Sequence, residues 1–319
     1  MQNFAYHIHH NGEHQGFTLD NFPISAVSEG FYWVDMDPKA PINKDWILQQ
    51  VTNDNAVIDI LFTNTDRPRL EVFDHSLVLS LRGVNFQDKD SPEDMVNIRF
   101  LITKQGIISF HTRDMRSVEI MKSYVDKGHK FTSQGTFLFA FLKLLNAFVF
   151  DETENLNDAL SQLEEVSLEG DILQAQGQLA DVRRLIIGFQ KFLIPQANVL
   201  HQLIESEGDW FKKKDSVHLK NEAEHLSTYV GELEHLRQRA TVLQEEIKSG
   251  LSDQISQNIY RLTIVATIML PLSMFAGLMG ANVGGIPFSQ SPYGFLIICL
   301  LTMGFGAIVY ALLKLLKWI

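Results

Sequence analysis

Cysteine is almost absent from this sequence, because Cys299 is the only one among 319 residues. A single cysteine excludes an intrachain disulfide and a Cys-x-x-Cys metal site. Walker A, dinucleotide-binding glycine, HExxH and Gly-x-Ser-x-Gly motifs are missing as well. We therefore expect neither an enzyme nor a resident cofactor, and no step driven by ATP hydrolysis.

Charged residues are missing from a long C-terminal stretch. Residues 262–313 are 52 residues without one Asp, Glu, Lys, Arg or His. Residues 259–319 carry three basic residues and no acidic ones, which leaves a formal charge of −14 for residues 1–258. Such an acidic region repels nucleic acid, so we expect no nucleic-acid partner. Two explanations of the acidity stay open, namely attraction of cations and ordinary solubility.

Two apolar segments in the C-terminal stretch are each long enough to cross a membrane. Residues 259–279 contain a single charge and residues 293–313 contain none. A hydrocarbon core of about 30 Å requires about 20 apolar residues in a helix, so we expect two transmembrane helices in a lipid bilayer. Residues 1–20 lack both a basic start and an apolar run, so we expect these helices, not a signal peptide, to direct insertion.

Basic residues predict the orientation of these helices. Arg261 lies at the start of the first segment, and Lys314 and Lys317 follow the second, whereas the connecting loop 280–292 is uncharged. Basic residues favour the cytoplasmic side of a membrane. We therefore expect an external loop, a cytoplasmic tail at 314–319 and both termini in the cytoplasm.

An apolar stripe with helical spacing leads into the first of these segments. Between Leu219 and Ser273 an apolar or small residue recurs on average every 3.6 residues, which is the period of an α-helix. We expect one helix over residues 218–279, about 90 Å long at 1.5 Å per residue. Its first part, 218–258, is predicted to be a cytosolic stalk that packs against helices of the same chain or of neighbouring subunits.

Residues 1–217 are predicted to form an α/β and helical cytosolic domain. Short apolar runs bounded by turn residues predict strands at 70–73, 77–81, 96–102 and 106–111. Residues 91–94 resemble the start of a helix. Helical patterns begin at about residue 132 and include 179–204, which contains Pro195.

The loop after the first predicted span carries a family motif. It begins Gly280-Ala281-Asn282 and continues Val-Gly-Gly-Ile-Pro. Gly-x-Asn at this position resembles the Gly-Met-Asn motif of the CorA superfamily of metal-ion transporters, and the extension resembles its zinc-transporting ZntB branch. Other similar segments are residues 67–71, 82–85, 92–96 and 270–272. The resemblance therefore covers nearly the whole chain.

This resemblance implies a homopentamer in the cell inner membrane, with the first transmembrane helices around a central pore. It places a ring of Asn282 side chains at the outer mouth, where amides can bind the water shell of a divalent cation without removing it. It also implies that one line of the first span faces the pore, namely Ser273, Leu270, Ala266, Leu262 and Ile259.

The sequence departs from the family pattern at two points. Ala281 replaces the bulky middle residue of the motif, which predicts a wider or less ordered mouth. The loop also lacks the acidic residue that is common after the motif in magnesium-transporting relatives. Attraction of cations is then expected to depend on dipoles.

Histidine spacing suggests a zinc site in the stalk. His218, Glu222 and His225 follow i, i+4 and i+7 spacing on one helical face, which can support zinc binding. The alternative is that these histidines simply face solvent.

Three functions are open from the sequence. The first is passive or proton-coupled transport of divalent metal cations, with zinc as the expected substrate. The second is a CorA-like channel for magnesium, cobalt or nickel. The third is a membrane-anchored metal sensor or scaffold that does not conduct, for which a ring of polar Asn282 side chains would serve no purpose.

Overall fold

The computed structural model describes residues 3–19, 22, 29–63, 67–86, 91–169, 172–206, 210–281, 287 and 291–315. The chain divides into two compact units, Met1–Gln244 and Glu245–Ile319. Helix α6 (Lys213–Met279) is continuous and contributes to both units. The helix expected over 218–279 is therefore present, with a start five residues earlier.

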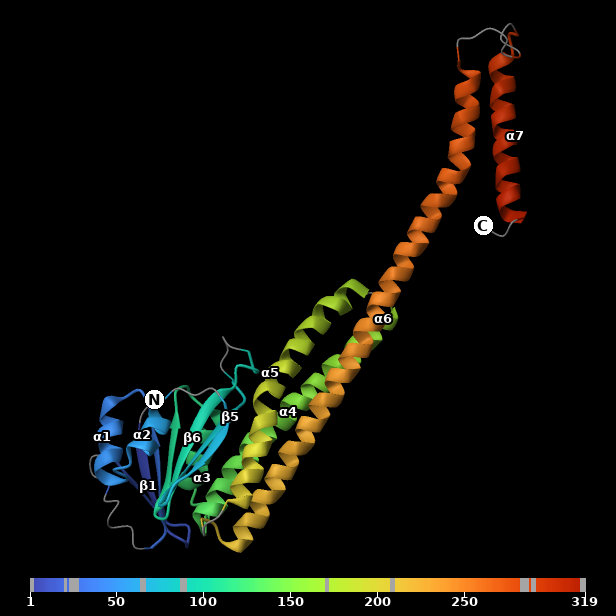
Figure 1. The fold of residues 1–319 in the computed structure, drawn as a ribbon. Coiled ribbons are helices and arrows are strands. Elements are labelled where there is room, and N and C mark those ends of the chain that lie inside the picture. Colours follow the sequence, from blue (N-terminus) through green and yellow to red (C-terminus); the bar gives the residue numbers. More distant parts are fainter. Residues whose placement is uncertain are drawn as a thin grey trace. The chain divides into compact units, whose positions relative to one another are not determined.

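A seven-stranded sheet forms the centre of the first unit, in the order β2-β1-β3-β7-β6-β5-β4 (Figure 1). The β3–β7 pair is parallel and all other pairs are antiparallel. All four strands predicted from the sequence are confirmed as β4 to β7. The strands are β1 Phe4–Ile8, β2 His14–Phe17, β3 Phe31–Met36, β4 Arg69–Val72, β5 Ser76–Gly83, β6 Val96–Thr103 and β7 Gly106–His111.

Helices cover both faces of this sheet, as the pattern of β3 illustrates. Tyr32 and Val34 belong to an apolar cluster with residues of α1 (Pro41–Gln50) and α2 (Asn55–Phe62). Trp33 points to the other face, where its ring lies 4.9 Å from that of Phe137 on α4. Every β3 residue is buried, because successive side chains enter two different cores.

The turn before β3 requires glycine. Gly30 has a φ of +99°, and a β-carbon added there would lie 2.1 Å from the carbonyl oxygen of Ile8. Only a residue without a side chain fits this approach of the backbone to β1.

Three long helices complete the first unit beside α3 (Arg116–Asp126): α4 (Gln134–Glu169), α5 (Ile172–Glu205) and the first part of α6. The apolar stripe of α6 is buried within this unit at Leu219, Ala223, Leu226, Leu233, Leu236, Ala240 and Leu243. Polar contacts join the same helices, since Arg239 donates to Asn157 Oδ1 and Glu164 Oε2, each at 2.8 Å. This part of the stripe thus packs within its own chain.

Residues 91–94 do not start a helix, contrary to the sequence prediction. The Asp94 amide donates to the Ser91 carbonyl and closes a single turn. The Arg82 guanidinium on β5 then donates to the Met95 carbonyl at 2.7 Å. This contact draws the segment directly into β6, so a tertiary contact overrides the local signal.

Candidate functional site

The second unit contains two apolar helices, the last part of α6 and α7 (Gly294–Leu315). Their most apolar windows are 0% and 6% buried within the structure. A core helix of a soluble protein would be mostly buried, because exposed apolar surface of this size is unfavourable in water. Both helices have the length and composition to cross a membrane.

α7 packs against one face of the α6 span. The rings of Phe275 and Phe305 stack with their centroids 5.9 Å apart. A β-carbon added at Gly306 would lie 3.4 Å from Leu272 Cδ2, which is ordinary contact distance. The side of α7 that loses exposure repeats at helical spacing, through Gly294, Ile298, Thr302, Gly306, Val309 and Leu313. This stripe was not predicted from the sequence, although its glycines mark where two helices can approach closely.

The half-buried residues of the α6 span lie on a single face. Between positions 259 and 279 they are Ile264, Thr267, Ile268, Pro271, Leu272, Phe275 and Met279. At about 100° per residue these positions centre about half a turn from Ala266. The line predicted to face the pore therefore lies on the side of α6 opposite to α7.

That predicted line is open to the surroundings in the single chain. Leu262 and Leu270 are 70% and 71% exposed, and Ile259 is 58% exposed. Ala266 and Ser273 are also exposed. The buried stripe of the first unit and this exposed line belong to the same helical periodicity, but only the former has packing partners among the described residues of the chain.

The threonine hydroxyls within the spans are satisfied inside their own helices. Thr263 Oγ1 donates to the Ile259 carbonyl at 2.8 Å, and Thr267 Oγ1 donates to the Thr263 carbonyl at 2.7 Å. On α7, Thr302 Oγ1 donates to the Ile298 carbonyl at 2.8 Å. Such bonds lower the cost of placing a hydroxyl in hydrocarbon, so these threonines are compatible with a membrane location.

The motif at the end of α6 is described only in part. The Gly280 amide donates to the Ala276 carbonyl at 2.9 Å and continues the helical pattern, and Ala281 follows it. Asn282 lies outside the described residues. Gly280 is not among the glycines with positive φ, so any need for glycine here comes from space and not from a left-handed turn.

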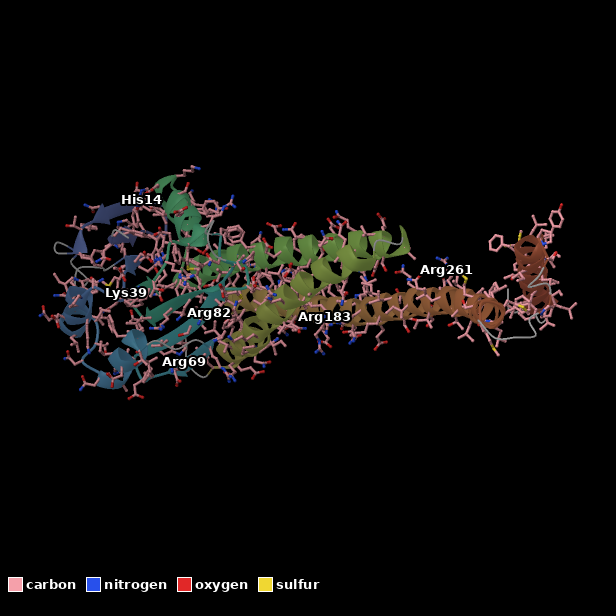
Figure 2. The ribbon with its side chains drawn as sticks, turned by 90° about the horizontal axis from the view of Figure 1, so that it is seen from above. His14, Lys39, Arg69, Arg82, Arg183 and Arg261 are labelled. Carbon is pink, nitrogen blue, oxygen red and sulfur yellow. The ribbon has the colours of Figure 1, made fainter. Side chains whose placement is uncertain are left out.

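Basic residues lie at one end of the α6–α7 hairpin. Arg261, labelled in Figure 2, is exposed near the start of the apolar part of α6. Lys314 lies in the last turn of α7. Lys317 is outside the described residues.

The structure does not assemble the zinc site predicted at His218, Glu222 and His225. Glu222 is buried and its Oε2 accepts from Asn146 Nδ2 on α4 at 2.9 Å. The His225 side chain is 60% exposed, with Nδ1 3.7 Å from Glu222 Oε1, and the His218 ring packs 5.0 Å from that of Phe139. In the part of the chain that the structure describes, no three His, Cys, Asp or Glu side chains gather as a metal site. The spacing thus brings Glu222 and His225 near each other, while Glu222 is also held by Asn146 and His218 packs on Phe139.

Comparisons with known proteins agree on one family. A family model described as "CorA-like Mg2+ transporter protein" matches residues 28–315. The "Divalent cation transporter CmaX" of Pseudomonas aeruginosa is 30% identical over 97% of this chain and 92% of its own. The "Zinc transport protein ZntB" of Pectobacterium atrosepticum is 26% identical over the full length of both chains.

Solved structures show the same fold. The full-length CmaX structure matches with a TM-score of 0.82 and 26% identity, over 99% of this chain and 97% of that one. The CorA magnesium transporter of Methanocaldococcus jannaschii matches with a TM-score of 0.83, over 100% of this chain and 99% of that one. The latter is only 17% identical, so it supports the fold alone.

Proposed function

The chain belongs to the CorA-like family of divalent cation transporters, and from this membership we propose that it moves zinc across the cell inner membrane through a pore lined by α6. Zinc is proposed because the relatives named as zinc transport proteins match along the entire chain. The loop after the Gly280-Ala281-Asn282 motif also lacks an acidic residue, which is common there in magnesium-transporting members of the family.

The position of α7 is the observation that carries this proposal. α7 covers the face of α6 around Leu272 and Phe275, so it leaves the line through Leu262, Ala266 and Leu270 uncovered. Copies of the chain can therefore surround an axis with these lines inward and their α7 helices outward toward lipid. A closed ring of this kind is a cyclic homo-oligomer, and we propose a pentamer.

Such a ring gives the pore distinct layers. Leu270, Leu262 and Ile259 would each repeat around the axis as apolar constrictions, which can stop ion flow by excluding water. Ser273 would add a ring of hydroxyls between the constrictions and the outer mouth. A hydrated cation would thus meet polar groups first and the apolar barrier afterwards.

Asn282 is proposed to bind the hydrated cation at the outer mouth. An amide offers a carbonyl oxygen and N–H donors without a fixed charge, so it can hold ion-bound water and still release it. Gly280 is proposed to allow close approach of neighbouring backbones at this level. The basic ends at Arg261 and Lys314 favour the cytoplasmic side, and we therefore propose that both termini lie in the cytoplasm and the 280–292 loop outside.

Metal flux into liposomes tests this function. Purified wild-type protein should carry zinc, and Asn282→Ala should abolish or greatly reduce the flux because one substitution changes every subunit of the ring. Gln290→Ala in the same loop is the matched control and should leave the flux unchanged. Cross-linking of both variants should give the same oligomer, which separates loss of binding from loss of assembly.

The competing functions give different results in the same assay. A channel for magnesium, cobalt or nickel would carry those ions in preference to zinc. A sensor or scaffold would carry none of them. Undiminished zinc flux through Asn282→Ala would show that this residue only turns the chain. A pH gradient across the liposomes tests for proton coupling.

A further inference from the structure

The first unit contains a basic cavity that ion transport does not explain. It has a volume of about 600 Å³ and lies between α5 and the part of the sheet where β5 ends and β6 begins. Its charged lining consists of Arg82, Arg113, Arg184 and Lys191, with Glu93 and Asp94 as the acidic residues. Acidic residues outnumber basic ones 38 to 27 in the whole chain, so the excess of basic residues in the cavity reverses the overall balance.

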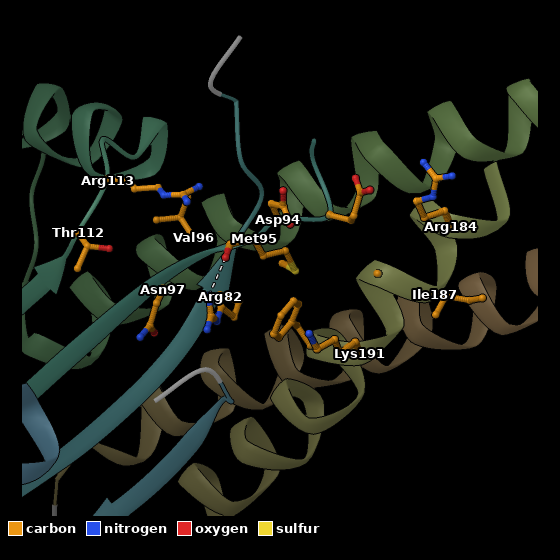
Figure 3. Close-up of a pocket in the computed structure, with 13 residues that line it drawn as sticks. Arg82, Asp94, Met95, Val96, Asn97, Thr112, Arg113, Arg184, Ile187 and Lys191 are labelled. Carbon is orange, nitrogen blue, oxygen red and sulfur yellow. Dashed lines mark hydrogen bonds between the residues drawn. The ribbon is translucent and has the colours of Figure 1, made fainter. Parts of the chain in front are cut away.

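The fold brings these basic residues together from separate parts of the chain. Figure 3 shows Arg113 on one side of the cavity and Arg184 on the other, with Arg82 and Lys191 between them. Arg184 and Lys191 are seven residues apart on α5, which places them on one face of that helix. Glu93 and Asp94 offset part of this positive charge, and the remaining excess of basic residues favours a bound anion.

The basic wall is held in place by the surrounding structure. The Arg82 guanidinium donates to the Met95 carbonyl and lies 4.7 Å from the centre of the Phe192 ring. The Arg113 carbonyl lies 2.8 Å from His111 Nδ1, which fixes its backbone beside β7. Arg184 and Lys191, in contrast, are exposed and can turn toward a ligand.

Besides negative charge, the ligand needs a hydrogen-bond donor, and Glu93 is the residue that requires it. Its Oε2 atom is buried and has no hydrogen-bond partner among the described residues. Gly188 makes this position possible, because a β-carbon there would lie 2.4 Å from the Glu93 β-carbon. A buried carboxylate oxygen without a donor is costly, so a ligand that supplies an N–H or O–H would offset that cost.

We propose that this cavity binds a small polyanion that also carries hydrogen-bond donors, which is the chemistry of a nucleoside polyphosphate. The phosphates would lie among Arg113, Arg184 and Lys191, and the nucleoside would donate to Glu93 beside the apolar surface of Ile187 and Phe192. The volume suits a ligand of this size. Because the ligand bridges the sheet and α5, its binding stabilises the first unit.

Binding of adenosine triphosphate to the full-length protein in detergent tests this proposal, with a chelator present to remove metal ions. Calorimetry should show one saturable site per chain for the wild type. Arg184→Gln and Lys191→Gln should each weaken binding about tenfold, as expected for loss of a hydrogen bond to a charged group. Lys220→Gln is the matched control. The Lys220 side chain is 61% exposed and pairs with Glu224 on its own helix, much as the Arg184 side chain is 72% exposed and pairs with Asp181. This control should bind like the wild type.

Inorganic tripolyphosphate, which has the phosphate charges and no nucleoside, tests the role of the charges separately from that of the hydrogen-bond donor. Glu93→Gln should weaken binding of adenosine triphosphate and leave tripolyphosphate binding equal or tighter, because it replaces a charged acceptor of the nucleoside by a weaker neutral one and removes a repulsive charge. Absence of saturable binding by the wild type, or an equal loss in Lys220→Gln and Arg184→Gln, would overturn the site. Equal responses of both ligands to Glu93→Gln would overturn the nucleoside assignment. None of these measurements uses metal flux, so they do not depend on the transport proposal.

Discussion

Two glycines of α7 provide a sharp test of how the membrane helices pack. Gly306 faces α6, and a β-carbon added there would touch Leu272. Gly304 is two residues away on the same helix, and a β-carbon added there would meet nothing within 4 Å. Leucine at position 304 should therefore extend into open space, whereas leucine at position 306 must place further carbons where Leu272 already lies.

The expected difference can be worked out from these contacts. Overpacking of a tight contact costs about 1–3 kcal/mol. Replacing glycine within a helix also gains about 1 kcal/mol of helix propensity, and this gain is shared by both variants. Gly306→Leu should therefore be less stable than Gly304→Leu by about 1–3 kcal/mol.

Unfolding of the purified protein in detergent measures this difference. Titration with sodium dodecyl sulfate should unfold Gly306→Leu at a lower detergent fraction than Gly304→Leu, and Gly306→Ala should be at least as stable as the wild type. Equal stability of the two leucine variants would refute the packing of α7 on the Leu272 face. The assignment of the opposite face to the pore would then lose its support.

Three further predictions concern the first unit and the pore. Burial lowers the pKa of His111, but the hydrogen bond and charge of Asp35 outweigh it and raise the pKa above its usual value. The stabilisation by this pair is then complete below about pH 6.5 and is lost as the pH rises through the folded-state pKa of His111. The midpoint of thermal unfolding should therefore fall over that pH range in the wild type. It should not fall in His111→Gln, which lacks the titrating imidazole. Arg239→Gln should lower the stability of the first unit by about 1–3 kcal/mol in thermal unfolding, because it removes charge-assisted bonds to α4, while the exposed Arg237→Gln should have almost no effect. Leu270→Ala should raise zinc leak into liposomes by widening an apolar constriction, and unchanged or lower leak would count against a barrier at this level.

The extent to which the sheet could be predicted depended on the strand. β5, β6 and β7 are apolar runs with buried residues on both faces, and such runs are distinctive in the sequence. β2 has the sequence His-Gln-Gly-Phe and is a strand because its backbone pairs with β1. Nothing in its composition predicts that pairing, since a polar edge strand is defined by its neighbour.

The long helix could be predicted almost completely, but the partners of its faces could not. The 3.6-residue period identified α6 and the line through Leu262 and Leu270. All sides of the α6 span are apolar, however, so periodicity could not tell which side α7 would cover. That choice depends on the fit of Leu272 and Phe275 against Gly306 and Phe305, which only the packed structure provides.

Reactivity of single cysteines tests the central claim most directly. In a Cys299→Ser background, Leu270→Cys places a thiol on the proposed pore line, and Leu278→Cys places one about a third of a turn away from it. The two side chains are 71% and 61% exposed in the single chain, so exposure alone does not distinguish them. A pore lined by Leu270 predicts that a water-soluble thiol reagent blocks zinc flux through Leu270→Cys and spares Leu278→Cys. Block of Leu278→Cys alone, or of neither variant while both carry zinc, would contradict the proposed pore.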